Sequence, residues 1–301
     1  MLWLGGLGLA QIEWTRPAGD LLSVVLVQAD IAQERKWDPA HIEHTLALYR
    51  DLSYAQRPVD ILVWPETAVP LLASTAGDFV QGVAANLAQR GTTLITGIPV
   101  DEYSADGSMR IYNGIMVATP EPQVYLKHKL VPFGEYVPLE QWLRGLIAFL
   151  DMPMSSFSRG PAEQAPLLAA GYRLAPLICY ETVYPAFTAK LAAQSELLIS
   201  ISNDSWFGHS IGPLQHLQMA RMRSIESGRW MMRGTNNGVT ALIDDRGVIR
   251  AQIPQFRQAT LSGWGQPRES LTPYLRVGNW PLGVLVVGML MVCIWQRRRA
   301  R

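Results

Sequence analysis

Cys179, Glu66 and Lys127 each come directly after a run of apolar residues, which is where a buried strand delivers polar side chains to the end of a sheet. A cysteine is a strong nucleophile only as a thiolate, so it needs a base that takes its proton. It also needs a cation that stabilises the negative charge on the attacked carbonyl oxygen. Glu66 and Lys127 have the chemical types for these two roles, so the sequence predicts a Glu-Lys-Cys active site.

Glu66 and Lys127 are weak signals when each is taken alone. A carboxylate just after a strand often caps a helix or lies in a solvated turn, and a lysine at a strand end is often a solvated flank. Lys129 is a second candidate for the cation. Because side chains two apart on a strand share a face, spacing alone does not choose between Lys127 and Lys129.

Cys179 is one of two cysteines, and the other, Cys293, lies inside an apolar segment near the C-terminus. We therefore expect no disulfide between them. A lone cysteine is most often a buried and inert side chain. Tyr180 and Glu181 follow Cys179 out of the apolar run, and the backbone amide after a nucleophile at a strand-to-helix turn is a ready oxyanion donor. These neighbours favour a reactive thiol.

Composition describes a folded chain without a dominant charge. Of the 301 residues, 49% are hydrophobic, which is enough for a substantial core. The 26 Lys and Arg nearly balance the 25 Asp and Glu, so no global field favours nucleic acid as a partner.

The C-terminal segment is predicted to cross a membrane. Residues 280–295 carry no charge, begin and end with tryptophan, and precede an arginine cluster, so we expect a transmembrane helix over 278–296. The positive-inside rule predicts a cytoplasmic basic tail at 297–301. The alternative is the buried C-terminal helix of a soluble protein, but a core helix seldom ends in four arginines. Residues 1–14 are apolar but too short to span, and we interpret them as the remnant of an N-terminal transmembrane segment.

Apolar runs and helical periodicity alternate through residues 22–265, which predicts one α/β catalytic domain. A turn at 244–247 between two apolar runs predicts a hairpin, and hence a mixed sheet. We expect a long loop, typical of a lid, at 145–166. The expected strands are 22–29, 59–64, 92–98, 111–118, 123–127, 173–178, 197–202 and 239–243. The expected helices begin at Asp38-Pro39 and cover 78–90, 182–194 and 213–231.

The sequence predicts neither a metal nor a nucleotide cofactor. His128, His209 and His216 lack metal-ligand spacing, and no glycine-rich phosphate loop precedes a helix. The run at 203–208 follows an expected strand and either shapes a pocket wall or forms a turn with aromatic packing.

Five motifs taken together resemble the nitrilase superfamily, and within it the membrane branch, the apolipoprotein N-acyltransferases. They are WPET at 64–67, YLKHKLVPFGEYVP at 125–138, ICYE at 178–181, NDSWFG at 203–208 and RSIESGRWMMRGTNNG at 223–238. The resemblance implies a four-layer αββα sandwich and selects Lys127 over Lys129. It implies Glu66 as general base, Lys127 as oxyanion stabiliser and Cys179 as the nucleophile that forms an acyl thioester.

The same resemblance implies the substrates and the location. A phospholipid would donate the acyl chain, and the N-terminal amine of a diacylglyceryl-cysteine on an apolipoprotein would accept it. The enzyme would be a monomer of the bacterial inner membrane with a periplasmic catalytic domain. Glu135 matches a supporting carboxylate, and further matching positions that handle substrate or support the site are Tyr180, Glu181, Trp37, Asn113 and Arg144.

Two alternatives to acyl transfer follow from the sequence. A membrane-tethered nitrilase-like amidase would use the same three residues but pass the acyl group to water. A non-catalytic fragment is the other alternative, because the family carries a multi-helix membrane domain before the catalytic domain. This chain looks like a truncated or differently started version that keeps only the last part of that domain.

Overall fold

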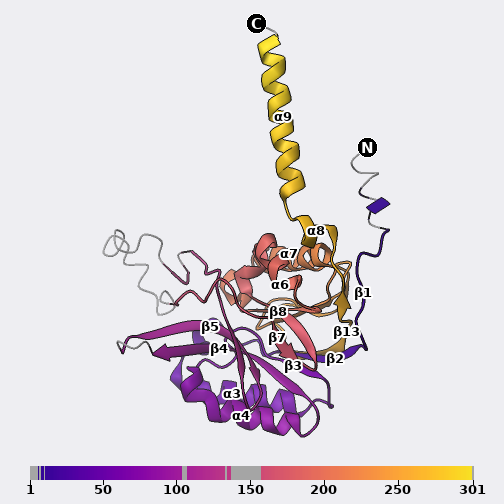
Figure 1. Cartoon of the computed structure of the whole chain (residues 1–301). Coiled ribbons are helices and arrows are strands. Elements are labelled where there is room, and N and C mark those ends of the chain that lie inside the picture. Colours follow the sequence, from indigo (N-terminus) through magenta and orange to yellow (C-terminus); the bar gives the residue numbers. More distant parts are fainter. Residues whose placement is uncertain are drawn as a thin grey trace, which may run out of the picture.

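Two six-stranded β-sheets stack face to face in the computed structural model, and helices cover both outer faces (Figure 1). The structure describes residues 6, 8–9, 11–103, 107–132, 134–136 and 157–299. The layers follow the order helix, sheet, sheet, helix. This arrangement confirms the predicted four-layer αββα sandwich.

The first sheet has the strand order β13-β2-β3-β4-β5-β6. Its strands β2, β3 and β4 are parallel, and β13, β5 and β6 join them as antiparallel neighbours. The strands span β2 (Leu22–Gln28), β3 (Ile61–Val63), β4 (Thr93–Tyr103), β5 (Met109–Ala118), β6 (Gln123–Leu126) and β13 (Ala259–Gly265).

The second sheet repeats this pattern with the order β12-β11-β10-β9-β8-β7. Here β8, β9 and β10 are parallel, and the outer strands are antiparallel. The strands span β7 (Leu167–Ala169), β8 (Tyr172–Ile178), β9 (Leu197–Ser202), β10 (Met231–Thr235), β11 (Thr240–Ile243) and β12 (Ile249–Ile253). A short pair, β1 (Arg16–Pro17) with β14 (Arg268–Glu269), lies outside both sheets.

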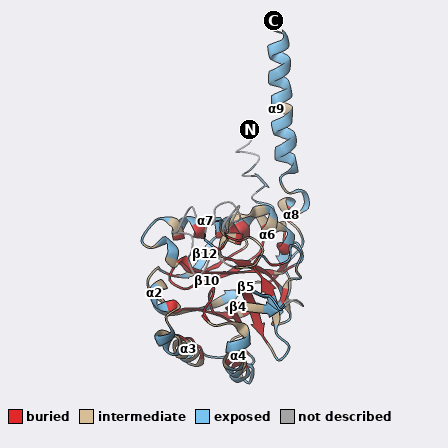
Figure 2. Cartoon of the chain, turned by 90° about the vertical axis from the view of Figure 1, so that its left-hand side faces the viewer, coloured by how far each residue is buried: buried red, intermediate tan, exposed pale blue. Residues whose placement is uncertain are grey.

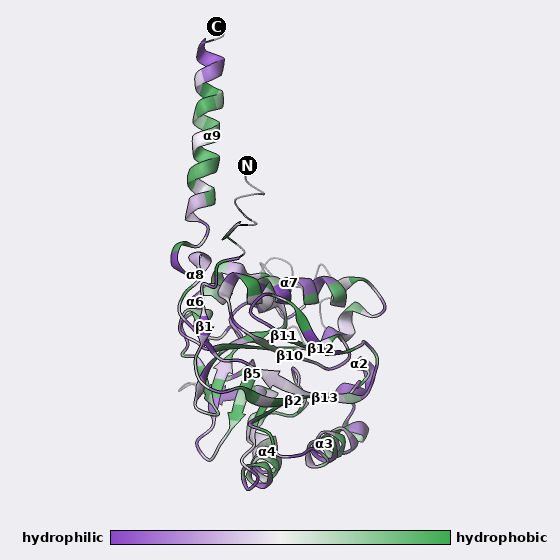
Figure 3. Cartoon of the chain, turned by 90° about the vertical axis from the view of Figure 1, so that its right-hand side faces the viewer, coloured by the Kyte–Doolittle hydropathy of each residue, from purple (hydrophilic) through white to green (hydrophobic). Residues whose placement is uncertain are grey.

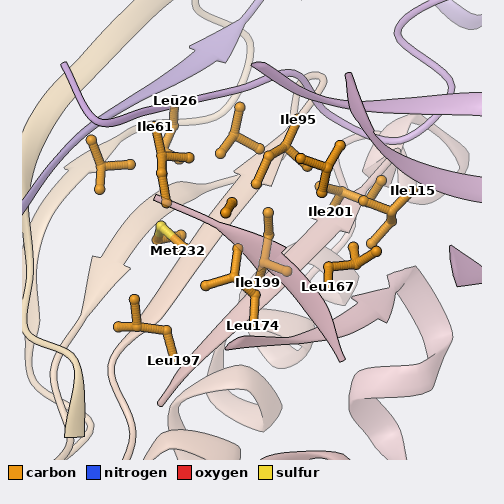
Figure 4. Close-up of a cluster of buried hydrophobic side chains, with 14 of the residues drawn as sticks. Leu26, Ile61, Ile95, Ile115, Leu167, Leu174, Leu197, Ile199, Ile201 and Met232 are labelled. Carbon is orange, nitrogen blue, oxygen red and sulfur yellow. The ribbon is translucent and has the colours of Figure 1, made fainter. Parts of the chain in front are cut away.

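Three apolar layers hold the sandwich together, and Figure 2 shows that the buried residues concentrate in the sheets. The central layer lies between the sheets, where Leu26 and Ile61 of one meet Ile199 and Met232 of the other (Figure 4). Because successive side chains of a strand point to opposite faces, the remaining apolar residues face the helices. Those helices are α3 (Pro39–Tyr54) and α4 (Ala73–Ala88) on the first sheet, and α6 (Pro185–Ala192) and α7 (Gly212–Ser227) on the second.

The start of α3 follows the predicted signal. The Asp38 side chain accepts a hydrogen bond from the backbone amide of Ala40, and Pro39 occupies the first helical turn. Such a cap gives a partner to one of the backbone N–H groups that a helix start leaves free. Pro39 has no N–H, so its position adds none that would need a partner.

The predicted end of the helix over 213–231 is wrong. Helix α7 ends at Ser227, because Gly228 takes the left-handed conformation (φ 61°) that closes helices. Met231 then begins the strand β10, with Met231 packed toward the helices and Met232 toward the other sheet. The predicted helix over 182–194 likewise starts late, at Pro185, because Cys179–Val183 form the 3₁₀-helix η2.

Two other expectations fall partly on residues that are not described. The structure describes 157–166 of the predicted loop at 145–166, and half of the apolar remnant at 1–14 also lies outside the described residues.

Helix α9 (Trp280–Arg299) projects from the sandwich, and none of its 20 residues is buried. Figure 3 shows the helix extending away from the domain, with hydrophobic residues along its middle and hydrophilic residues at its C-terminal end. At 1.5 Å per residue the helix is ~30 Å long, which matches the hydrocarbon thickness of a bilayer. Within the described part of the chain it is the one helix that is long and apolar enough to cross a membrane.

Candidate active site

Glu66, Lys127 and Cys179 line one cavity of about 590 Å³, which lies where strands of both sheets end. Lys127 comes one residue after β6, Glu66 lies in the turn after β3, and Cys179 follows β8 of the second sheet. Asn113, on β5, also lines the cavity. The stacking of the sheets therefore brings together side chains that are far apart in the sequence.

Lys127 is shared by two carboxylates. Its ammonium nitrogen donates to Glu135 Oε1 at 2.7 Å and lies 3.5 Å from Glu66 Oε1. The lysine is only 1% exposed. Burial by itself would lower the pKa of Lys127, but the negative charges of Glu66 and Glu135 outweigh it and hold the pKa above the usual value. Lys127 therefore stays a cation that can stabilise an oxyanion.

Glu66 is held in one orientation by donors on both oxygens. Asn113 Nδ2 donates to Glu66 Oε1 at 2.7 Å and to Glu135 Oε1 at 3.3 Å, and the backbone amide of Asn203 donates to Glu66 Oε2 at 2.6 Å. Gly97 of β4 lets the turn that carries Glu66 approach, since a Cβ there would lie 2.5 Å from the Pro65 carbonyl oxygen. The carboxylate is thus fixed beside the cavity before any substrate binds.

Cys179 is half-buried and starts η2 with a left-handed backbone (φ 48°). A non-glycine residue in that conformation is strained, and such strain is concentrated at functional sites. Burial and the negative charge of Glu66 raise the pKa of the Cys179 thiol, although Lys127 opposes them. The resting group is therefore a thiol that needs a base, and Glu66 is the carboxylate that could take its proton.

Glu181 is fully buried and lies behind the cavity wall. Its carboxylate accepts hydrogen bonds from Tyr125 Oη and from the backbone amides of Ile178, His128 and Lys129. These bonds tie the segment after Lys127 to the end of strand β8, directly before Cys179. Burial raises the pKa of this carboxyl. Glu181 could support the site by fixing its backbone, while its neighbour Tyr180 lines the cavity itself.

The structure distinguishes Lys127 from Lys129 as the candidate cation, a choice that sequence spacing left open. Strand β6 ends at Leu126, so Lys127 and Lys129 do not continue on one strand face. Lys127 lines the cavity, whereas the Lys129 ammonium lies 5.5 Å from the centre of the Tyr184 ring. Lys127 is thus the lysine that the fold brings to Cys179.

One of the predicted substrate-handling residues lies away from the cavity, and another is not described by the structure. Trp37 follows the short helix α2 (Gln33–Lys36) and is half-buried, and the described residues that line the cavity do not include it. Arg144 lies outside the described residues.

Sequence reasoning missed two polar residues beside the site. Lys36 Nζ donates to the backbone oxygen of Glu66 at 2.9 Å, and burial lowers the pKa of this lysine to about 8 against the opposing charges of Glu66 and Cys179. His216 Nε2 lies 3.0 Å from the backbone oxygen of Cys179. No sequence motif could have identified either residue, because Lys36 is 30 residues from Glu66 and His216 is 37 residues from Cys179.

The remaining wall of the cavity is largely apolar. Trp206 and Phe207 belong to it, and Asn203 also lines the cavity, so the structure supports the pocket wall among the two alternatives for 203–208. The other apolar side chains that line the cavity are Val131, Val183 and Met219. In the described ranges, no three His, Cys, Asp or Glu side chains come together as a metal site would require.

Comparison with known proteins agrees with this geometry. Residues 23–263 match the carbon-nitrogen hydrolase family. The chain is 56% identical over 296 residues to an apolipoprotein N-acyltransferase of Pseudomonas paraeruginosa and 57% identical over 288 residues to that of Pseudomonas putida. These alignments cover 98% and 96% of this chain but 58% and 57% of the relatives, so the chain spans little more than half their length.

Solved structures share the fold at low sequence identity. Nit3 of Saccharomyces cerevisiae, a member of the nitrilase superfamily, has a TM-score of 0.60 at 16% identity, with 85% of this chain and 93% of Nit3 covered. An amidase from Nesterenkonia has a TM-score of 0.54 at 18% identity, with 90% and 97% covered. The nitrilase-like fold implied by the motifs is therefore confirmed, and the chain belongs to the carbon-nitrogen hydrolase family.

Proposed function

We propose that this chain is the catalytic part of an apolipoprotein N-acyltransferase. It would transfer a fatty acyl chain from a phospholipid, through a Cys179 thioester, to the N-terminal amine of a diacylglyceryl-cysteine on an apolipoprotein. The observation that carries the proposal is the meeting of Glu66, Lys127 and Cys179 at one cavity with an apolar wall. The names of the relatives and the apolar helix α9 add to it.

In the first half-reaction Cys179 is acylated. Glu66 takes the thiol proton while the sulfur attacks the ester carbonyl of the phospholipid. Lys127 and the backbone amide of Tyr180 stabilise the oxyanion of the tetrahedral intermediate. The ester C–O bond then breaks, and Glu66 returns the proton to the departing lysophospholipid oxygen. The products are an S-acyl cysteine and a lysophospholipid.

In the second half-reaction the acyl group leaves Cys179. The free α-amine of the acceptor attacks the thioester carbonyl, and Lys127 again stabilises the oxyanion. Glu66 takes a proton from the attacking nitrogen, the C–S bond breaks, and that proton returns to the thiolate. The cycle needs no cofactor.

Other residues serve these steps indirectly. Asn113 would orient Glu66, Glu135 would balance the charge of Lys127, and Glu181 would fix the backbone on both sides of the site. Roles for Trp37 and Arg144 in substrate handling rest on the motif resemblance alone.

We further propose that α9 crosses the bacterial inner membrane. The arginines at its end would then be cytoplasmic, and the sandwich would lie on the periplasmic side as a monomer. A fully exposed apolar helix is unfavourable in water, because it leaves a large apolar surface hydrated. A bilayer removes that cost and brings the cavity close to its lipid donor.

The decisive experiment separates acylation from transfer. The purified chain in detergent is incubated with a phospholipid carrying a labelled acyl chain, and mass spectrometry locates a thioester on Cys179. A synthetic diacylglyceryl-cysteine peptide is then added, and the label should move to its amine. A Cys179→Ala variant is the control.

The same assay tests the two alternatives. If small amides release ammonia and free acid while phospholipid gives no thioester, the chain is an amidase. If neither substrate is processed and the chain fails to complement cells depleted of the acyltransferase, it is a non-catalytic fragment. Either result would overturn the proposed function.

A further inference from the structure

A second buried polar cluster lies against Cys179 on the side of the second sheet, and the proton transfers above do not use it. It consists of Asp204, His216 and Arg233, which are 2%, 5% and 0% exposed. Asp204 begins the 3₁₀-helix η3 (Asp204–Phe207), His216 lies on α7 and Arg233 lies on β10. Three separate elements thus meet directly behind the nucleophile.

Asp204 anchors this cluster. Its Oδ1 accepts from Ser202 Oγ at 2.5 Å and lies 3.0 Å from His216 Nδ1, and its Oδ2 accepts from Arg233 at 2.9 Å. Gly238 allows the close packing, since a Cβ there would lie 2.3 Å from Asp204 Oδ2. Burial would raise the pKa of Asp204, but Arg233 and His216 outweigh it and lower the pKa to about 2. The carboxylate is therefore ionised at every pH near neutrality.

The imidazole of His216 is fixed from both sides. Its Nδ1 lies between Asp204 and Arg233, which is 3.1 Å away, and its Nε2 lies 3.0 Å from the Cys179 carbonyl oxygen. A carbonyl oxygen can only accept a hydrogen bond. This hydrogen bond therefore forms in the tautomer that carries its proton on Nε2, and Nε2 is the donor.

This bond acts on the peptide unit that joins Cys179 to Tyr180. The unit is planar, and in the trans form its carbonyl and its N–H point in opposite directions. A donor that holds the Cys179 oxygen therefore also fixes the direction of the Tyr180 N–H. That N–H is the group assigned above to the oxyanion.

We propose that His216, held by Asp204 and Arg233, is a positioning residue that aims the Tyr180 amide at the oxyanion of acyl transfer. The inference rests on the proposed function only for the identity of the natural acyl donor. The role of His216 does not depend on that donor, since any ester that acylates Cys179 passes through an oxyanion. His216 lines the cavity, but the atom of Cys179 that it contacts is the backbone oxygen, so its proposed role is to hold that backbone.

Two variants of His216 separate positioning from simple packing. In His216→Gln the side-chain amide nitrogen reaches the position of Nε2, so the donor to Cys179 is kept. In His216→Asn the shorter amide reaches only the position of Nδ1, and the Cys179 oxygen loses its partner. The pair thus differs in the one hydrogen bond that the proposal invokes.

The readouts are two reactions of Cys179 in the full chain. Acylation by a p-nitrophenyl ester forms an oxyanion, whereas alkylation by iodoacetamide forms none. We expect His216→Asn to lower the maximal acylation rate about 10- to 100-fold at unchanged KM, as a misplaced catalytic group does. We expect alkylation to stay close to wild type, thermal stability to fall because a buried oxygen loses its donor, and His216→Gln to restore acylation.

Three results would overturn the proposal. The first is wild-type acylation by His216→Asn. The second is an equal loss of acylation and alkylation in both variants, which marks a structural role. The third result comes from ¹⁵N NMR of His216 in the wild-type protein, which decides the question if His216→Asn does not fold. An Nε2 without a proton contradicts the proposal, and a protonated Nε2 agrees with it.

Failure of the proposed function would look different. A wild-type chain that is acylated by the p-nitrophenyl ester but not by phospholipid would have a different natural donor. The comparison of His216→Asn with His216→Gln would still decide the role of His216.

Discussion

Cys179 lies between two buried charge clusters that serve different parts of the same residue. Glu66, Lys127 and Glu135 come from the first sheet's side and face the sulfur across the cavity. The cluster of Asp204, His216 and Arg233 comes from the second sheet's side and contacts the backbone. Both clusters are buried and both contain ion pairs, so neither burial nor charge distinguishes the cluster that we propose to be catalytic. The difference is that one faces the Cys179 sulfur and the other contacts the Cys179 backbone.

The two clusters should also respond differently to substitution. A side chain that faces the cavity has water or substrate as a replacement partner, so its loss affects the reaction most. A buried ion pair away from water leaves an uncompensated charge when one partner is removed, so its loss affects folding most.

The largest expected effect is the loss of Cys179. Without the sulfur no thioester can form, so Cys179→Ala should lower acyl transfer at least about 10⁴-fold. Single-turnover kinetics with labelled phospholipid measures this. Cys293→Ser is the matched control, because Cys293 lies on the exposed helix α9 and should leave the rate unchanged. Label that moves to Cys293 in the alanine variant would remove Cys179 from the mechanism.

Arg233→Met tests the cluster that contacts the backbone. The substitution leaves the buried Asp204 carboxylate without its cationic partner, so it should lower the free energy of unfolding by about 3–5 kcal/mol. Urea denaturation in detergent, followed by tryptophan fluorescence, gives this value. A loss below about 1 kcal/mol, the usual value of an exposed pair, would mean that water reaches this cluster.

Lys127→Met tests the cluster that faces the cavity. With Lys127 in its proposed role as the cation that stabilises the oxyanion, its removal should lower kcat about 10²- to 10³-fold. Lys129→Met is the matched control from the same segment, and its kcat should stay near wild type because Lys129 lies outside the cavity wall. If Lys129→Met is the more damaged variant, the assignment of the two lysines is reversed.

Lys36→Met should give the smallest effect, and it depends on pH. An unfolded lysine has a pKa of about 10.4, and the buried Lys36 has a pKa of about 8. Between these values the unfolded state holds more protons, so the stability of the wild type rises with pH relative to the variant, by up to about 3 kcal/mol. Denaturation of both proteins from pH 7 to pH 10 measures this difference. Parallel stability curves would show that Lys36 is not buried as a charge.

The sequence predicted the parts of the site that local patterns control. Apolar runs placed Glu66 and Cys179 at strand ends, and the motifs implied the sandwich that the strand order confirms. These predictions succeed because a buried strand needs a continuous apolar run, and its end is marked by the first polar residue.

Local patterns did not predict features that depend on neighbouring elements. The end of α7 was missed because Gly228, not a change of periodicity, closes the helix. Lys36 and His216 were missed because they reach Glu66 and Cys179 only after separate elements pack together. Spacing could not select Lys127 over Lys129, because it does not show where β6 ends.

The connection between the sandwich and α9 would set the position of the domain relative to a membrane that α9 crosses. The short helix α8 (Pro273–Val277) contacts α6 and α7, and only Gly278 and Asn279 separate it from α9. With α9 in the bilayer, so short a tether holds the cavity at a nearly constant height and tilt above the lipid surface. The search for a donor then becomes diffusion in two dimensions, and the local concentration of phospholipid is set by the membrane and not by the surrounding solution.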